Sequence, residues 1–358
     1  MSCGWRRSSI MKKMLKAAAV LAAILMAFTL GACSDGDDGG SGNGGGGGGG
    51  GSSYLKIEGN KVTGVHLNKI PSDGKIVIPD GVEELDSQWY WDIDAFDARE
   101  DDYLLPVDKV TSISLPASLK SSYSVIPDSW TDYGVQTQLD IDIIYRGTLA
   151  DYCKIKMASY NLRVAKGIKV GNDDLKTLET LVIPDGATEI AEQAFRTLTN
   201  IKSVTIPKTV KEIGGDAFGE YQVGDIVAVT YKGTLKDWCD IKNDLLLVQA
   251  QSIKMSDGKD LKTLTEITAN DIAGATKIGD YAFAYCEKLT DVVIPESVTE
   301  IGRSVFHSCD ALKSMTFEIT DGWYQKAFWS YEVDEVVDVS NKLENARLQL
   351  SSLYRKTE

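Results

Sequence analysis

Leu181-Val182-Ile183-Pro184 is followed by Val204-Thr205-Ile206-Pro207, and 23 residues separate the two prolines. The same interval separates Phe195 from Phe218, Phe283 from Phe306 and Cys286 from Cys309. Self-similarity at a fixed period of this length is typical of solenoids, in which each repeat buries its apolar face against the next. The recurring positions therefore predict a solenoid that stacks 23-residue units.

Each unit starts with a short alternating run such as Ser203-Val204-Thr205-Ile206, whose period of two predicts a half-buried strand. Proline ends the strand because it has no amide hydrogen to donate to a ladder. The apolar residues that follow in one unit have helical spacing, which predicts a helical turn or loose coil for the return of the chain: Ile190, Ala194, Leu198 and Ile201. Stacked units would then form a parallel sheet on one face.

A longer duplication encloses the short repeat. The segment from Tyr145 to Lys156 returns as Tyr231 to Lys242, offset by 86 residues. Each copy holds one irregular long repeat and two regular ones. Before residue 145 the pattern is interrupted, with about six extra residues between Pro79 and Phe96. Such insertions map to loops on one face of a solenoid, often the binding face.

These residues resemble the BspA-type leucine-rich repeats of bacterial surface proteins, and the resemblance covers residues 54–320. It implies an α+β repeat fold, a leucine-rich-repeat solenoid with a parallel sheet on one face and irregular or short helical turns on the other. It also implies a curved, ligand-presenting protein of the bacterial cell surface, with adhesion as its role. No catalytic or binding residue follows from the resemblance, because the motif consists of core positions.

The N-terminal 53 residues predict an export signal and a tether. Residues 1–32 combine a basic start with a short apolar run, as in a signal peptide, and the run ends in Leu30-Gly31-Ala32-Cys33. This sequence resembles a lipobox, so we expect Cys33 to be lipidated; ordinary cleavage beside a coincidental cysteine is the alternative. Residues 33–53 are an acidic, Gly/Ser-rich stretch that predicts a flexible tether. Its acidic run is either a surface-export signal or a solvated linker.

Two caps are expected at the ends of the solenoid. Ile57 and Val62 flank Gly59-Asn60, a hairpin-type turn pair, so residues 54–75 predict an N-terminal hairpin cap. Residues 321–358 predict a C-terminal cap with a helix over about 341–355, because Asn341 and Glu344 form a capping box before an apolar stripe. A partner-binding helix is the alternative for that segment.

Charge and cysteine content exclude several classes of partner. The chain carries a formal net charge of −14, which argues against nucleic acid and against electrostatic docking to anionic lipid, so the lipid on Cys33 would be its only membrane contact. Cys286 and Cys309 would stack on adjacent turns, and we expect buried free thiols there, with a disulfide as the alternative. No two cysteines have CxxC spacing, so neither zinc nor another metal or cofactor is expected.

No catalytic motif is present, and His66 and His307 have no nucleophile or carboxylate pattern around them, so we expect no enzyme. The strongest candidate for ligand binding is the insertion, with its aromatic and acidic side chains: Trp89, Tyr90, Trp91, Asp92 and Asp94. Its aromatic residues could instead cover the open end of the solenoid. Three functions remain open: a surface-exposed, outer-membrane lipoprotein that binds a protein, for example of a host; a glycan-binding surface lipoprotein; and a structural periplasmic lipoprotein without a host ligand.

Overall fold

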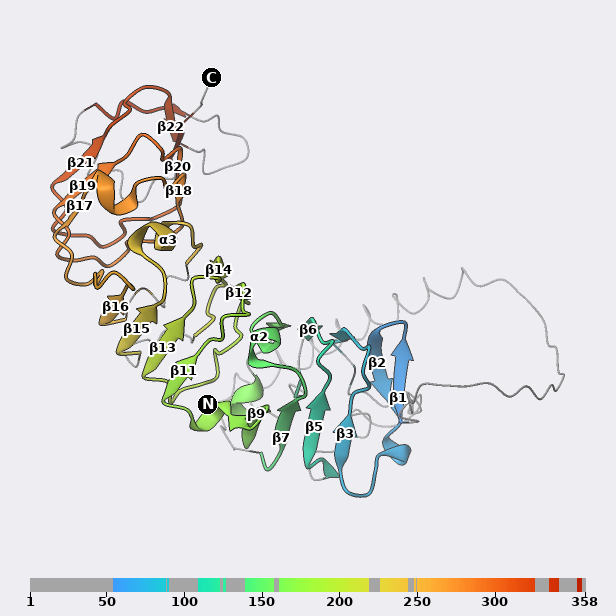
Figure 1. Cartoon of the computed structure of the whole chain (residues 1–358). Helices are drawn as coiled ribbons and strands as arrows, with labels where there is room; N and C mark the ends of the chain where they lie inside the picture. The colour runs from blue at the N-terminus through green and yellow to red at the C-terminus, as the bar shows by residue number, and fades with distance from the viewer. Residues whose placement is uncertain are drawn as a thin grey trace, which may run out of the picture. The chain divides into compact units, whose positions relative to one another are not determined.

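The computed structural model describes residues 54–87, 89, 109–122, 125–126, 139–157, 161–218, 226–243, 248, 250–325, 335–340 and 353–355. All of them belong to one compact unit, residues 49–358. Within this unit the chain repeatedly passes along two rows of strands, one of longer and one of two-residue strands (Figure 1). This arrangement confirms the predicted solenoid with a parallel sheet on one face.

The longer strands form three sheets whose principal strands pair in parallel. The first contains β3 (Lys75–Val77), β5 (Ser112–Leu115), β7 (Asp142–Tyr145) and β9 (Gly167–Val170), with β10 (Asp173–Asp174) antiparallel at its edge. The second contains β11 (Thr180–Val182), β13 (Ser203–Ile206), β15 (Ala228–Tyr231) and β16 (Ser252–Lys254), and the third β17 (Glu266–Ile267), β19 (Asp291–Ile294) and β21 (Ser314–Phe317). Val204 and Ile206 are buried while Ser203 and Thr205 are only partly covered, as the alternation predicts.

Two-residue strands form the second row, where helical turns were expected. They are β4 (Glu84–Leu85), β6 (Ser121–Ser122), β8 (Lys156–Met157), β12 (Glu189–Ile190), β14 (Glu212–Ile213), β18 (Lys277–Ile278) and β20 (Glu300–Ile301). Ile190 thus lies in a parallel ladder with Ile213, and its assignment to a helical turn was wrong. Ile190, Ala194, Leu198 and Ile201 are all buried. Their spacing therefore marks burial at successive corners of the coil.

Short helices occur in the long repeats and confirm the duplication. They are α2 (Leu149–Tyr152) and α3 (Leu235–Cys239), 86 residues apart, with the 3-10 turns η1 (Leu67–Lys69), η5 (Asn161–Val164), η6 (Leu175–Thr177) and η9 (Ala269–Ile272). Both α-helices start with the same capping box, in which a threonine and an aspartate satisfy each other's backbone amides: Thr148 with Asp151, and Thr234 with Asp237.

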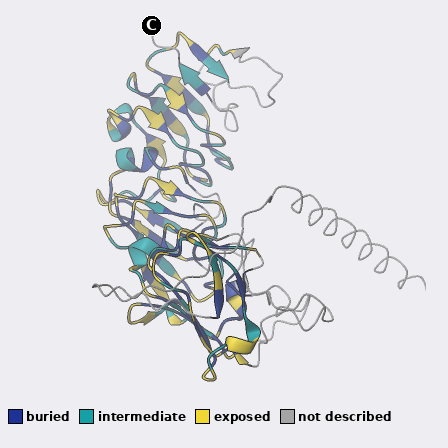
Figure 2. Cartoon of the chain, turned by 90° about the vertical axis from the view of Figure 1, so that its right-hand side faces the viewer, coloured by how far each residue is buried: buried dark blue, intermediate teal, exposed yellow. Residues whose placement is uncertain are grey.

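Aromatic rings stack from turn to turn inside the coil, where the residues are buried (Figure 2). The ring centroids of Phe195 and Phe218 are 5.6 Å apart, and those of Phe283 and Phe306 are 5.7 Å apart. Both pairs hold equivalent positions of consecutive repeats. The 23-residue period of the phenylalanines therefore records stacked rings in the core of each pair.

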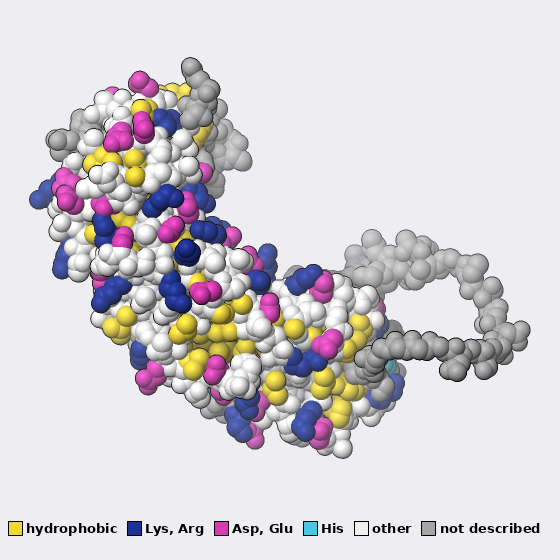
Figure 3. Space-filling model, in the orientation of Figure 1, with side chains coloured by type: hydrophobic (Ala, Val, Ile, Leu, Met, Phe, Trp, Pro, Cys, Tyr) yellow, Lys and Arg dark blue, Asp and Glu magenta, His cyan; other side chains and the backbone are white. Residues whose placement is uncertain are grey.

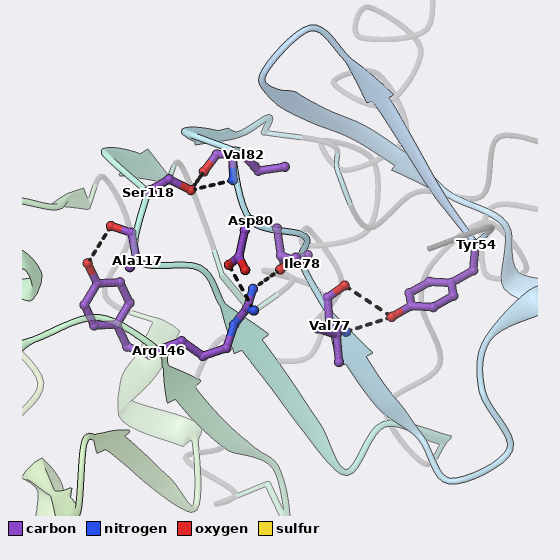
Figure 4. A network of polar contacts seen from close by, with 10 residues as sticks. Tyr54, Val77, Ile78, Asp80, Val82, Ala117, Ser118 and Arg146 are labelled. Atoms are coloured by element: carbon purple, nitrogen blue, oxygen red, sulfur yellow. Dashed lines mark hydrogen bonds and ion pairs between the residues drawn. The ribbon is translucent and has the colours of Figure 1, made fainter. Parts of the chain in front are cut away.

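The N-terminal end has the predicted hairpin, in which β1 (Leu55–Glu58) pairs antiparallel with β2 (Lys61–Val65). The Tyr54 hydroxyl accepts a bond from the Val77 amide at 2.8 Å and lies 3.3 Å from the Val77 carbonyl, to which it donates (Figure 4). Val77 belongs to β3, the edge strand of the first sheet. Tyr54 therefore occupies backbone groups that would otherwise be open to another chain.

Two further contacts in Figure 4 tie the first repeats together. The Arg146 guanidinium donates to the Ile78 carbonyl and lies 3.0 Å from the Asp80 carboxylate. The Ser118 hydroxyl donates to the Val82 carbonyl at 2.7 Å and accepts a bond from the Gly81 amide at 3.0 Å. These bonds link residues 36 to 68 positions apart, so they stabilise the irregular turns where the repeat is interrupted.

The C-terminal cap differs from the prediction. Residues 353–355 form strand β24 (Leu353–Arg355), which pairs antiparallel with β20 and with β22 (Trp323–Gln325), and β23 (Glu335–Val336) pairs with β22. The helix expected over 341–355 is therefore wrong at 353–355, and residues 341–352 lie outside the described residues. Leu353 is buried as its apolar stripe suggested, but it is buried in a ladder. β24 covers the edge of β20, where unpaired backbone groups would remain.

Candidate functional site

The insertion does not present Trp89 to solvent. The Trp89 side chain is fully buried in the core, so its expected role in stacking on a ligand is corrected to a packing role. The other candidates of that segment, Tyr90, Trp91, Asp92 and Asp94, lie outside the described residues. The capping alternative fits the burial of Trp89 better, because a buried indole at this end covers the core of the first repeats.

The two regular pairs of repeats are residues 181–221, the first pair, and residues 278–317, the second pair. A different set of outward side chains lies on a third ladder, within the second pair. The amides of Tyr281, Phe283 and Tyr285 donate to the carbonyls of Arg303, Val305 and His307 at 3.1, 3.0 and 2.7 Å. Phe283 and Val305 point into the core. The alternate ladder positions, Tyr281 and Tyr285 on one turn and Arg303 and His307 on the next, are at least partly exposed. The ladder therefore places Tyr281 beside Arg303 and Tyr285 beside His307.

These four residues are called the Tyr/Arg array here: Tyr281, Tyr285, Arg303 and His307. The Arg303 guanidinium lies over the Tyr281 ring, 5.3 Å from its centroid. The Tyr285 and His307 rings meet edge to face with centroids 5.4 Å apart. Arg303 is exposed and the other three are partly exposed. Among the described residues, no carboxylate forms an ion pair with Arg303, so its donors remain open to a partner.

The backbone holds the array in an uncommon conformation. Tyr281 and Tyr285 both have φ near 57°, in the left-handed region that non-glycine residues rarely adopt. Beneath them, the Lys262 ammonium donates to the Tyr285 carbonyl at 2.9 Å and to the Val248 carbonyl. Burial lowers the pKa of Lys262. This lysine therefore fixes the position of the turn that bears Tyr285.

The first regular pair offers the same scaffold with different side chains. There the amides of Gln193 and Phe195 donate to the carbonyls of Gly215 and Ala217 at 3.1 and 2.8 Å, and Gln193 has φ 61°. Gln193 holds the position of Tyr281, and Gly215 that of Arg303. Lys176, the equivalent of Lys262, donates to the Arg163 and Ala165 carbonyls of the preceding turn, and no bond from it to the turn after Phe195 is shown among the described residues. The core is thus shared, and the outward residues differ.

The sequence analysis considered His307 only as a possible catalytic residue and did not find the array. The sequence nevertheless contains a signal for the array. When the two regular pairs are aligned at an offset of 88 residues, the core residues agree and the outward residues differ. Ala194-Phe195 matches Ala282-Phe283, while Gln193 faces Tyr281 in the alignment. The sequence alone does not indicate that these outward positions lie side by side on a hydrogen-bonded ladder.

The described residues offer little catalytic or metal chemistry. Among them, no group of three or more His, Cys, Asp or Glu side chains could hold a metal ion. The four thiols there, Cys153, Cys239, Cys286 and Cys309, are buried and free, in agreement with the expected core role of Cys286 and Cys309. Burial raises the pKa of Cys153 to about 12, so this thiol is not a nucleophile at neutral pH. In the same part of the chain, no helix is long and apolar enough to cross a membrane.

Comparison with known proteins matches the repeats to one family. A family model for the BspA-type leucine-rich repeat region matches residues 173–239 and 236–345 in six copies. The repeats of this chain belong to the BspA-type leucine-rich-repeat family. Residues 54–172 precede the match, but the bond from the Ala191 amide to the Cys153 carbonyl joins them to it at 2.7 Å. The matched repeats and the turns before them therefore form one continuous stack.

Solved structures of leucine-rich-repeat proteins show weaker similarity to this BspA-type chain. A leucine-rich cell surface protein from Faecalibacterium prausnitzii is 17% identical, with 74% of this chain and 75% of that one covered, at a TM-score of 0.29. A leucine-rich-repeat protein from Eubacterium ventriosum is 14% identical, with 74% and 70% covered, at 0.27. The pneumococcal vaccine antigen PcpA is 16% identical, with 75% and 80% covered, at 0.25. A search of curated proteins found no match.

Proposed function

We propose that this BspA-type chain is a lipid-anchored, surface-exposed binding module of the bacterial outer membrane, and that its Tyr/Arg array contacts a protein partner. The proposed localisation rests on the sequence. Residues 1–32 have the features of a signal peptide, Cys33 follows a lipobox-like segment, and residues 33–53 would provide the tether. The BspA-type repeats support a role in interaction, because stacked repeats create extended surfaces for binding.

The main support for a binding role is that the two regular pairs share one backbone ladder but differ in the side chains that this ladder points outward. Tyr281 and Arg303 replace the glutamine and glycine of the matched positions, while the Phe283–Phe306 stack preserves the core. Tyrosine and arginine are enriched among the residues that dominate protein–protein binding energy. Arg303 can donate two parallel bonds to a carboxylate, and the tyrosine hydroxyls can donate as well. The array therefore suits a protein segment that presents aspartate or glutamate.

A glycan ligand fits less well. Stacking on a sugar needs a free aromatic face, yet the Arg303 guanidinium lies over Tyr281 and the Lys262 ammonium lies 5.8 Å from the Tyr285 ring centroid. Trp89, the strongest candidate for such stacking in the sequence, is buried. The acidic and basic side chains visible in Figure 3 are interspersed. Attraction of a carboxylate-bearing partner would then depend on local contacts, because the net charge of −14 repels it at long range.

Proteolysis of intact cells tests whether the protein is exposed on the cell surface. When the full chain is produced in a Gram-negative bacterium, we expect proteinase K to digest it on intact cells, because the tether would present the repeats outside. The Cys33→Ala variant is expected in the soluble fraction, since it lacks the lipid. A wild-type chain that resists protease on intact cells and is digested only after lysis would contradict surface exposure and favour the structural periplasmic alternative.

Titration with fluorescein-labelled poly-L-glutamate tests the array. We expect the wild-type chain to raise the anisotropy of the probe, and Tyr281→Gln/Arg303→Gly to bind at least about tenfold more weakly, because both substitutions remove donors at a contact of the kind that dominates binding. These substitutions introduce the residues that the first pair already carries on the same ladder, so the fold is kept.

The matched control is Gln193→Asn/Thr197→Ala, which changes the equivalent turn of the first pair and is expected to bind like the wild type. Labelled polygalacturonate serves as a second probe. Binding of polygalacturonate without binding of polyglutamate would support the glycan alternative against the protein partner. No binding of either polymer by the wild-type chain would contradict carboxylate recognition.

A further inference from the structure

We propose that Cys286 and Cys309 join two adjacent repeats through a disulfide when the chain folds in an oxidising compartment. The two residues hold the same position of consecutive 23-residue units, and both are buried free thiols in the structure. The proposal concerns how the scaffold is stabilised, and it does not depend on the array's ligand.

The backbone around the two thiols makes the same hydrogen bonds in both repeats. The Leu289 amide donates to the Cys286 carbonyl at 3.0 Å, and the Leu312 amide donates to the Cys309 carbonyl at 2.9 Å. The phenylalanines three residues before each cysteine, Phe283 and Phe306, stack at 5.7 Å. Adjacent strands lie roughly 4.8 Å apart, within the separation of about 4.4–6.8 Å between Cα atoms that a disulfide requires.

The Cys309 thiol contacts the repeat that bears Cys286. The Cys309 thiol donates to the Phe283 carbonyl at 3.1 Å, and the Cys286 amide donates to the same carbonyl at 3.3 Å. The Cys286 thiol lies close enough to Cys309 to influence its pKa. The Cys309 side chain therefore lies against the turn that bears Cys286.

In the folded repeats, the surroundings favour the thiolate of Cys309 over that of Cys286. The Cys286 thiol lowers the pKa of Cys309, and the Lys262 ammonium nearby adds to this effect. The equivalent lysine of the first copy, Lys176, has no thiol pair beside it, because Leu198 and Tyr221 hold the matching positions. Lys262 thus keeps its role as a backbone donor and additionally stabilises a thiolate.

The oxidant required is a small disulfide such as oxidised glutathione. The Cys309 thiolate attacks one of its sulfur atoms, which forms a mixed disulfide and releases one thiolate that takes up the Cys309 proton. Cys286 then loses its proton, attacks the Cys309 sulfur and expels the second thiolate, which takes up that proton. Two cysteine thiols and one disulfide thereby become the Cys286–Cys309 disulfide and two small thiols.

Burial determines when the reaction can occur. Cys286 is 1% exposed and Cys309 is fully buried, so an oxidant reaches them before the repeats close, during folding. Cys153 and Cys239 provide an internal control. They lie 86 residues apart in separate copies, each is buried, and burial raises the pKa of both. They are expected to stay reduced under the same conditions.

Refolding of the full chain from denaturant with reduced and oxidised glutathione tests the proposal. Free thiols are then labelled with maleimide after denaturation, and the peptides are mapped by mass spectrometry. We expect a linked peptide pair containing Cys286 and Cys309, with Cys153 and Cys239 labelled. The oxidised chain is expected to unfold at a midpoint temperature higher by about 5 °C, and a reductant added during unfolding should abolish this difference.

Two variants separate the disulfide from general packing. Cys153→Ala/Cys239→Ala is expected to retain the linked peptide and its sensitivity to reductant, whereas Cys286→Ala/Cys309→Ala is expected to lack both. Labelling of Cys286 and Cys309 in the refolded wild-type chain would overturn the proposal. Links from either residue to Cys153 or Cys239 would overturn it equally.

Discussion

Leu181→Asp is expected to lower the free energy of unfolding by about 4 kcal/mol or more, enough to unfold the middle of the stack. Leu181 is fully buried in β11, where a carboxylate would have neither water nor a cation partner. Val182, the next residue of the same strand, is 51% exposed. Val182→Asp is therefore expected to change the free energy by no more than about 0.5 kcal/mol.

Urea unfolding followed by circular dichroism measures both variants. The pair is informative because it places one substitution on two adjacent residues of one strand, so strand propensity and net charge change alike. Similar losses of stability for the two variants would contradict the orientation of β11 and the assignment of its inner face.

Trp238→Ala is expected to cost about 3–5 kcal/mol of unfolding free energy. The Trp238 side chain is fully buried, its ring meets Tyr231 edge to face at 5.2 Å, and its indole nitrogen donates to the Ala282 carbonyl at 2.7 Å. That bond spans 44 residues and joins the long repeat to the second regular pair. Removing the indole therefore leaves both a cavity and an unpaired carbonyl where two kinds of repeat meet.

Trp238→Phe separates the two contributions, because it keeps most of the ring and loses only the hydrogen bond. We expect it to cost about 1–3 kcal/mol in the same urea unfolding experiment. Should Trp238→Ala unfold within about 1 kcal/mol of the wild-type chain, the proposed contact between the long repeat and the second pair would be wrong.

The sequence predicts those parts of the fold that repeat. Each Ile-Pro step recurs because every unit needs the same strand end and the same buried side chain, so Pro184 and Pro207 sufficed to set the period. The N-terminal hairpin was equally readable, since Gly59 at φ 64° belongs to a local turn. The capping boxes at Thr148 and Thr234 follow the 86-residue duplication for the same reason.

Features that depend on contacts between neighbouring turns could not be predicted from the sequence pattern. A two-residue strand such as Glu189–Ile190 exists only because Glu212–Ile213 lies beside it, and no local pattern distinguishes it from a corner of a helix. Leu353 likewise has an apolar stripe that fits a helix, but the open edge of β20 pairs with it. Trp89 looked exposed because it stands among acidic residues, yet it is buried in the core.

The central claim is that binding resides in outward side chains on a constant repeat scaffold, and a reciprocal exchange tests it most directly. Tyr281→Gln/Arg303→Gly removes the array's donors, and adding Gln193→Tyr/Gly215→Arg places them on the first pair, where an added Cβ at Gly215 meets no atom within 4 Å. In the polyglutamate titration, the first variant is expected to lose at least about tenfold in affinity and the exchange to regain most of it. Wild-type affinity in the first variant, or no recovery in a folded exchange variant, would contradict the claim.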